Sequence, residues 1–151
     1  MSESQIHGMI DISDKKIMLR ISSAEGYIHL SDESIARITN KTNEKGDVLE
    51  NAKLAAIQGA KMTPQLVFMA HPIKINSVKA IFRIEKNNVH CTVTIKAIDK
   101  TGVEIEAVAA VMNALLAIFD LSKRYEKDEN GEYQVARISG IKVTKKTKEE
   151  L

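Results

Sequence analysis

The chain has 151 residues, of which 44% are hydrophobic and 28% are charged, and its formal net charge is +2. These proportions fit one globular domain with a hydrophobic core and exclude a disordered chain. The small charge, the absence of tryptophan and a total of only six phenylalanines and tyrosines argue against a nucleic-acid binder.

Cysteine usage and hydropathy indicate a compartment. Cys91 is the only cysteine, which excludes an internal disulfide and a zinc site built on paired cysteines and fits a reducing cytoplasm. The first residues lack the apolar core of a signal peptide. The longest uncharged apolar run, 107–119, is shorter than the roughly 18 residues that span a bilayer. We expect a soluble cytoplasmic protein.

The first third of the chain predicts a flexible arm, two strands and two helices. Residues 1–8 are polar and patternless. Alternating apolar residues over 16–30 predict two short strands around a turn at 24–26. The hydroxyl of Ser31 begins a short helix that ends near Asn40.

A second helix is predicted over 48–62, because Asp47 and Glu50 form a capping pair at its start. Thr63-Pro64 ends this helix and begins one further helical turn. Alternation over 78–85 and 89–97, around Asn87-Asn88, predicts an antiparallel hairpin with one buried face.

The predicted helix over 103–124 is apolar around most of its circumference and therefore needs cover on more than one side. A last strand is predicted over 133–143, ahead of a lysine-rich end. The order of elements predicts an α+β sandwich, with helices on one face of an antiparallel sheet. We expect a single domain over 9–146 and a tail over 147–151.

Familiar nucleotide and metal signatures are missing. The sequence has no Walker or Rossmann glycine motif, no HExxH and no GxSxG. Its four histidines are isolated, so no protein metal site is expected. Any phosphate would have to be held by lysine and arginine side chains.

Several residues could carry chemistry, and each also has a structural explanation. Asp120 and Lys123 share a helix face, either as a surface ion pair or as proton-transfer groups in a partly dry pocket. Glu104 and Glu106 suit a helix N-terminus in any case. Lys45 lies where a loop meets a helix start, which can hold an anion or simply be a capped end.

Five segments together resemble the cyclic pyranopterin monophosphate synthase family of molybdenum cofactor biosynthesis. They are MIDISDK (9–15), KGDV (45–48), HPI (71–73), KTGVEIEA (100–107) and DLSK (120–123). They occur in the family's order and at its spacings. KTGVEIEA followed by DLSK is the most specific combination.

The resemblance implies roles for particular residues. Asp120 and Lys123 correspond to the catalytic pair. The implied substrate-binding residues are Arg20, Lys45, Met69, Ala70, His71, Glu104, Ile105, Glu106 and Lys146. Ala70 stands where the family often has cysteine, and Ile105 where it often has methionine. The family's glycine-rich tail is replaced here by lysines, so Lys146 has the weakest sequence support.

The family further implies a ferredoxin-like fold and a homohexamer built as a trimer of dimers, with sites at subunit interfaces. The implied reaction is conversion of 3',8-cyclo-7,8-dihydro-GTP, a small molecule, to cyclic pyranopterin monophosphate and diphosphate. No organic cofactor is implied, although a divalent ion could accompany the triphosphate. The alternative is a non-catalytic ferredoxin-like module that binds or scaffolds RNA or an acidic partner through its lysines.

The spacing of Glu104 and Asp120 along one helix bears on whether a site lies at a subunit interface. Glu104 and Asp120 are 16 residues apart on one predicted helix, which places them ~24 Å apart at 1.5 Å per residue. One nucleotide-sized pocket cannot use both ends of a straight helix. We therefore expect a second protomer to supply one of the two ends.

Overall fold

The computed structural model describes residues 8–151, so the arm expected over 1–8 lies outside the described residues except for Gly8. One antiparallel sheet has the strand order β2-β3-β1-β4. Its strands are β1 (Met18–His29), β2 (Ile75–Ile84), β3 (Asn88–Asp99) and β4 (Arg137–Glu149). The helices are α1 (Asp32–Asn40), α2 (Val48–Lys61), α3 (Thr63–Leu66) and α4 (Glu104–Ser122), which continues into a 3-10 turn, η1 (Lys123–Tyr125).

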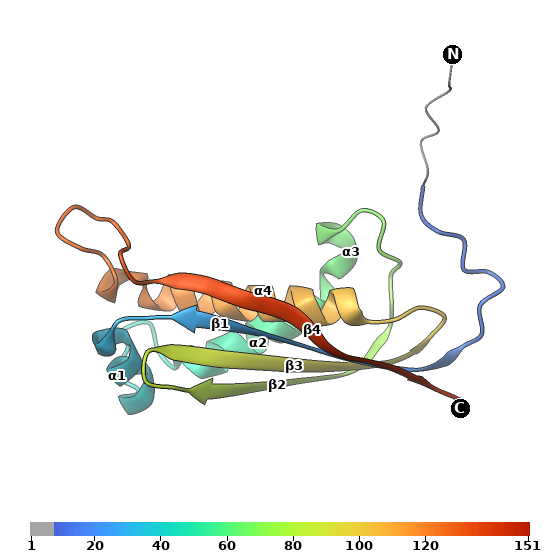
Figure 1. Ribbon diagram of the computed structural model, residues 1–151, viewed down its shortest axis with the longest axis horizontal. Coiled ribbons are helices and arrows are strands. Elements are labelled where there is room, and N and C mark those ends of the chain that lie inside the picture. The colour runs from blue at the N-terminus through green and yellow to red at the C-terminus, as the bar shows by residue number, and fades with distance from the viewer. Residues whose placement is uncertain (1–7) are drawn as a thin grey trace, which may run out of the picture.

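The order of these elements along the chain, together with the strand order, is the ferredoxin-like arrangement. The long helices α2 and α4 lie side by side on one face of the sheet (Figure 1). Helix α1 lies at one end of the sheet, and α3 stands at the other, near the start of α4 (Figure 1). The predicted α+β sandwich is confirmed.

Both predicted helix starts are capped as the sequence indicates. The Ser31 hydroxyl accepts a hydrogen bond from the Ser34 amide, and the Asp47 carboxylate accepts one from the Glu50 amide at 3.1 Å. These caps satisfy amides that the first helical turn leaves free, and they fix where α1 and α2 begin.

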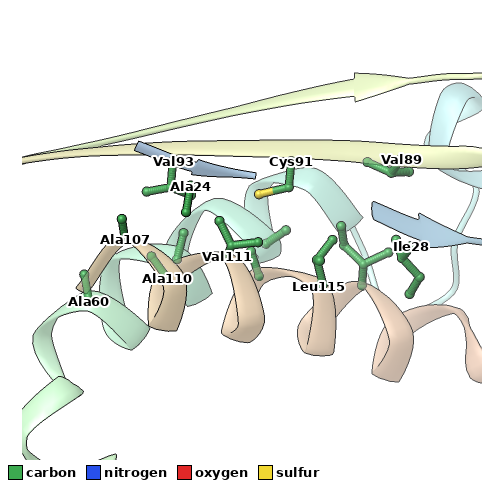
Figure 2. Close-up of a cluster of buried hydrophobic side chains, with 14 of the residues drawn as sticks. Ala24, Ile28, Ala60, Val89, Cys91, Val93, Ala107, Ala110, Val111 and Leu115 are labelled. Carbon is green, nitrogen blue, oxygen red and sulfur yellow. The ribbon is translucent and has the colours of Figure 1, made fainter. Parts of the chain in front are cut away.

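The core lies between the sheet and the two long helices. Figure 2 shows Val89, Cys91 and Val93 of β3 facing Ala110 and Val111 of α4. All five are fully buried. Small alanines on the facing helices let α2 and α4 approach the sheet closely. Burial in this core raises the pKa of the Cys91 thiol to about 12.

The two short strands expected over 16–30 are one continuous strand, so that prediction is wrong. Gly26 does not turn the chain: a Cβ there would lie 2.8 Å from side-chain atoms of both Val111 and Leu115. The glycine is needed so that β1 can pass close beneath α4. The pairing of β1 with β4 shifts register between Ser23 and Ala24, and again across Gly26, between Glu25 and Tyr27.

The last strand also differs from the expectation. It covers Arg137–Glu149, so three residues of the expected tail belong to the sheet, while Tyr133 makes only an isolated bridge with Lys127. β4 is an edge strand with mostly exposed residues. A lysine-rich edge strand has little apolar alternation to detect, and its charges discourage pairing with another chain.

Helix α4 receives the cover that its composition demands from two sides, the sheet and α2. The helical segment Glu104–Tyr125 is long and apolar enough by composition to cross a membrane, but 56% of its most apolar window is buried inside the chain. It is packed as a core helix. Leu116 and Met112 remain more than half exposed on its outer side.

Candidate functional site

A cleft of about 370 Å³ opens at the start of α4. It gathers residues from β1, β4, the loop before α4, the segment after α3 and the N-terminal segment. Its lining includes eight of the residues implied by the resemblance: Arg20, Met69, Ala70, His71, Glu104, Ile105, Glu106 and Lys146. Segments distant in sequence therefore converge on one hollow. We call it the α4-start cleft.

Arg20 is held rigidly at this cleft. It lies on β1 and is 6% exposed. Its Nη2 donates to the Lys100 carbonyl at 2.9 Å, and its Nε donates to the Asp99 carbonyl at 3.3 Å. These bonds fix the loop that precedes α4 and leave a delocalised cation at the base of the cleft.

Glu104 pairs with the lysine that had the weakest sequence support. Lys146 Nζ lies 3.3 Å from Glu104 Oε1, which joins β4 to the first turn of α4. Glu104 Oε2 is buried without a hydrogen-bond partner among the described residues. A Cβ on Gly102 would lie 2.3 Å from that oxygen, so a larger residue there would force the Glu104 carboxylate to move. An N–H donor of a ligand would satisfy this oxygen.

Glu106 is the most unusual carboxylate of the cleft. It is 2% exposed, and burial raises its pKa to about 7, helped by the nearby charges of Glu104 and Asp99. A group with this pKa can both give and take a proton near neutral pH. Helix-dipole complementarity alone does not explain a carboxylate buried at this depth.

The N-terminal segment lies along the same cleft. His71 Nε2 is 2.8 Å from the Ile10 carbonyl and donates to it, while Lys100 Nζ donates to the Ser13 carbonyl at 3.1 Å. Lys15 and Thr101 also line the cleft. Sequence reasoning assigned these two no role, although both lie inside the quoted segments.

The remaining three implied residues meet at the opposite end of α4. Lys45 Nζ lies 3.2 Å from Asp120 Oδ2, and Lys123 Nζ lies 3.4 Å from Asp120 Oδ1. Hydrogen bonds from Lys45, and then from Lys123, hold the pKa of Asp120 below its usual range. We call these residues the α4-end triad.

The loop that carries Lys45 is tied down by its neighbours. Asn43 Nδ2 donates to the Leu121 carbonyl at 2.8 Å, and the Glu44 amide donates to the Tyr125 hydroxyl at 3.1 Å. Arg124 forms an ion pair with Glu44. Contacts across the end of α4 thus anchor the loop that carries Lys45.

Of the two explanations for Asp120 and Lys123, the single chain shows the surface ion pair and not the partly dry pocket. The Asp120 side chain is 56% exposed. Ile118 and Leu121 are buried, but successive helical residues point about 100° apart, so apolar neighbours in sequence do not cover the carboxylate. In isolation, the triad has the exposure of a surface ion pair.

The cleft and the triad do not meet within one chain, because they stand at opposite ends of α4 (Figure 1). Nor does the part of the chain from residue 8 onward contain a cluster of three or more His, Cys, Asp or Glu side chains suited to a metal ion. Cations around the cleft come from Arg20, Lys15 and Lys146. The arrangement suits a charged organic ligand.

Comparisons with known proteins agree with the resemblance. The MoaC family model matches residues 9–148. A protein of Sulfurisphaera tokodaii named probable cyclic pyranopterin monophosphate synthase is 48% identical, over 98% of this chain and 96% of its own length. A protein of Archaeoglobus fulgidus with the same name is 45% identical, over 93% and 90%. A protein of Methanothermobacter thermautotrophicus, 41% identical over 95% and 90%, is named probable cyclic pyranopterin monophosphate synthase accessory protein.

Proposed function

The chain belongs to the MoaC family, and we propose that it converts (8S)-3',8-cyclo-7,8-dihydroguanosine 5'-triphosphate to cyclic pyranopterin monophosphate and diphosphate. The coarser function, a lyase of molybdenum cofactor biosynthesis, follows from the family and from the names of relatives. The observation that carries the proposal is the α4-start cleft, where eight implied substrate-binding residues converge.

The cleft has groups for both halves of such a substrate. Arg20, Lys15 and Lys146 can neutralise phosphate oxygens. The unpartnered oxygen of Glu104 and the neighbouring Glu106 can accept hydrogen bonds from the N–H groups of a guanine-derived ring. Volume is also suitable, since about 370 Å³ lies within the usual range for small-molecule sites.

The α4-end triad supplies the groups that move protons. In the proposed reaction, Asp120 and Lys123 exchange protons with the substrate while its imidazole portion opens and the pterin ring forms. A ribose hydroxyl then gives its proton to the Asp120–Lys123 pair and attacks the α-phosphorus. The bond from that phosphorus to the oxygen shared with the β-phosphate breaks, and diphosphate leaves. Lys45 stabilises the negative charge.

Both sets of residues can serve one substrate only if two copies of the chain share a site. Glu104 and Asp120 are ~24 Å apart along α4. We propose that the α4-start cleft of one protomer faces the α4-end triad of another, within a hexamer built as a trimer of dimers. Such a contact also buries Asp120, and burial raises the pKa of a carboxylate toward the range in which it can give and take a proton.

Several further expectations belong to this proposal. The enzyme is expected to act in the cytoplasm and to need no organic cofactor, with a divalent ion able to accompany the triphosphate. The rival function, a scaffold that binds RNA or an acidic partner through its lysines, does not explain why Glu104 and Glu106 line the cleft beside its cations. An accessory role, as in the name of one relative, would leave the cleft without chemistry to perform.

The direct test is incubation of the purified protein with the cyclised GTP, with diphosphate and the cyclic pterin both measured. Asp120→Asn should retain the fold and lower turnover by on the order of 10²-fold or more, the scale of a lost acid–base group. Arg83→Gln, an exposed change on β2 that belongs to neither the cleft nor the triad, is the matched control. Normal turnover by the Asp120→Asn protein would overturn the assignment.

A further inference from the structure

An apolar groove runs along the outer side of the helical layer, between α2 and α4. It encloses about 720 Å³ and is lined mainly by apolar side chains of both helices. Leu54 and Leu116 face it and are 63% and 57% exposed. Asp120 and Leu121 line the end of the groove nearest the α4-end triad. Large exposed apolar side chains gathered in a groove mark a binding surface.

A second exposed apolar feature stands at the other end of α4. The segment after α3 presents Leu66, Val67, Phe68 and Met69, all exposed, and Phe68 is 91% exposed. Figure 1 shows α3 and this segment projecting from the body of the chain near the start of α4. Met69, Ala70 and His71 of the same segment line the α4-start cleft. The single chain thus leaves a phenylalanine ring almost entirely in water beside the cleft, although burial of such a ring is strongly favourable.

We propose that Phe68 of one copy of this chain packs into the α2–α4 groove of a second copy, and that this contact joins the two halves of the shared site. The inference rests on the proposed function, which requires the α4-start cleft of one protomer to meet the α4-end triad of the other. Each apolar surface borders one half of that site, so joining the halves brings the two surfaces together.

Symmetry makes the contact self-consistent. A two-fold axis crossing α4 near its middle, at right angles to the helix, lays the start of one α4 over the end of the other. The same operation places each Phe68 over the partner's groove, so both rings are covered in one interface. Both surfaces carry more cations than anions, since Arg20, Lys15 and Lys146 line the cleft and Lys45 and Lys123 belong to the triad, so the joined site suits the triphosphate proposed as its ligand.

The contact also explains the position of Phe68 next to the site. The ring is two residues before Ala70 and three before His71, whose imidazole donates to the Ile10 carbonyl. Fixing Phe68 in the partner therefore fixes the wall of the cleft that carries His71. We infer that Phe68 is a positioning residue, and that the cleft reaches its final form only in the dimer.

Cross-linking between two single-cysteine variants tests the contact. Phe68→Cys and Leu116→Cys are both exposed changes, and the native Cys91 is fully buried, with a pKa of about 12 that keeps it unreactive. A short bismaleimide added to the mixed variants, after subunit exchange, should give a covalent dimer containing one of each chain. The matched control is Ile81→Cys with Leu116→Cys, because Ile81 is an apolar residue of β2 that is more than half exposed and lies outside the proposed contact. That control should give little cross-linked dimer.

Self-association provides the second measurement. Phe68→Ala should weaken dimer formation by at least about tenfold in sedimentation, the effect of losing a central aromatic anchor, while Ile81→Ala should not. Absence of the mixed cross-link in a protein that sediments as an oligomer overturns the Phe68 contact, whereas diphosphate release still decides the proposed reaction. If the mixed cross-link forms but the protein releases no diphosphate, the Phe68 contact stands and the proposed reaction is rejected. A protein that stays monomeric overturns the contact.

Discussion

The buried carboxylate of Glu106 should control how stability depends on pH. Its ordinary pKa of 4.5 is raised to about 7 by burial in the folded chain. The folded state therefore favours the protonated form, and between these two values it binds more protons than the unfolded state. The free energy of unfolding consequently falls as pH rises from about 4.5 to about 7, and this group causes no further loss above that range.

The size of the effect follows from the shift. One pKa unit corresponds to about 1.4 kcal/mol, so a rise from 4.5 to about 7 corresponds to about 3 kcal/mol. Glu106→Gln replaces the carboxyl group with a neutral group of similar shape and removes this cost. We expect the variant to match the parent protein near pH 4.5 and to be more stable by about 3 kcal/mol at pH 8.

Urea denaturation between pH 4.5 and pH 8.5 measures the difference, at one protein concentration because self-association shifts apparent stability. Glu129→Gln removes a carboxylate from an exposed turn and serves as the control, with an expected difference of under about 0.5 kcal/mol at every pH. A difference between Glu106→Gln and the parent that stays constant across this range would refute the reasoning, because it would mean that Glu106 titrates normally.

Two other predictions concern the lysines of the triad and the packing of β1. Lys45→Ala should mainly raise KM, because Lys45 is proposed to hold phosphate, and Lys123→Ala should mainly lower kcat, because Lys123 is proposed to move protons. Steady-state kinetics separate the two effects. Small and equal effects of both changes would mean that neither lysine acts on the substrate. Gly26→Ala should destabilise the fold by about 1–3 kcal/mol in urea denaturation, because its Cβ would meet buried atoms of Val111 and Leu115, whereas Gly8→Ala, with open space around it, should be neutral.

Much of the fold could be predicted because its signals are local. The β2–β3 hairpin alternates cleanly, since one face is buried and the other is exposed. The start of α2 is fixed by Asp47, which the sequence already marks as a cap. The errors fall where tertiary contacts decide. Gly26 resembles a turn residue until α4 is placed above it, and β4 lacks apolar alternation because most of its side chains are exposed.

The candidate site divides in the same way. Motif resemblance gave the residues, but it could not indicate which of them lie together. Lys45 and Asp120 are 75 positions apart in the chain, and only folding shows their contact. Glu104 and Glu106 read alike in the sequence, yet one pairs with Lys146 and the other is buried. Their environments differ because positions two apart on a helix point about 200° away from each other.

The shared site makes a quantitative prediction about mixtures of inactive proteins. Asp120→Asn damages the triad, and Glu106→Gln damages the cleft. If each site takes its triad from one chain and its cleft from another, random exchange in an equal mixture leaves half of the triads and half of the clefts intact. About a quarter of the sites then have both parts intact, so about a quarter of the parent activity should return.

Sites confined to single chains cannot recover, since every chain carries a defect in its own site. Subunit exchange must be verified independently, by the mass of mixed oligomers that contain one isotopically labelled variant. A mixture of Asp120→Asn with Lys123→Ala is the matched control, because both changes damage the same triad and no combination restores it. Verified exchange with activity no higher than that of the two separate variants would contradict the shared site, even if the parent protein releases diphosphate. Recovery near a quarter, with none in the control, would require that the two ends of α4 act together across a subunit boundary.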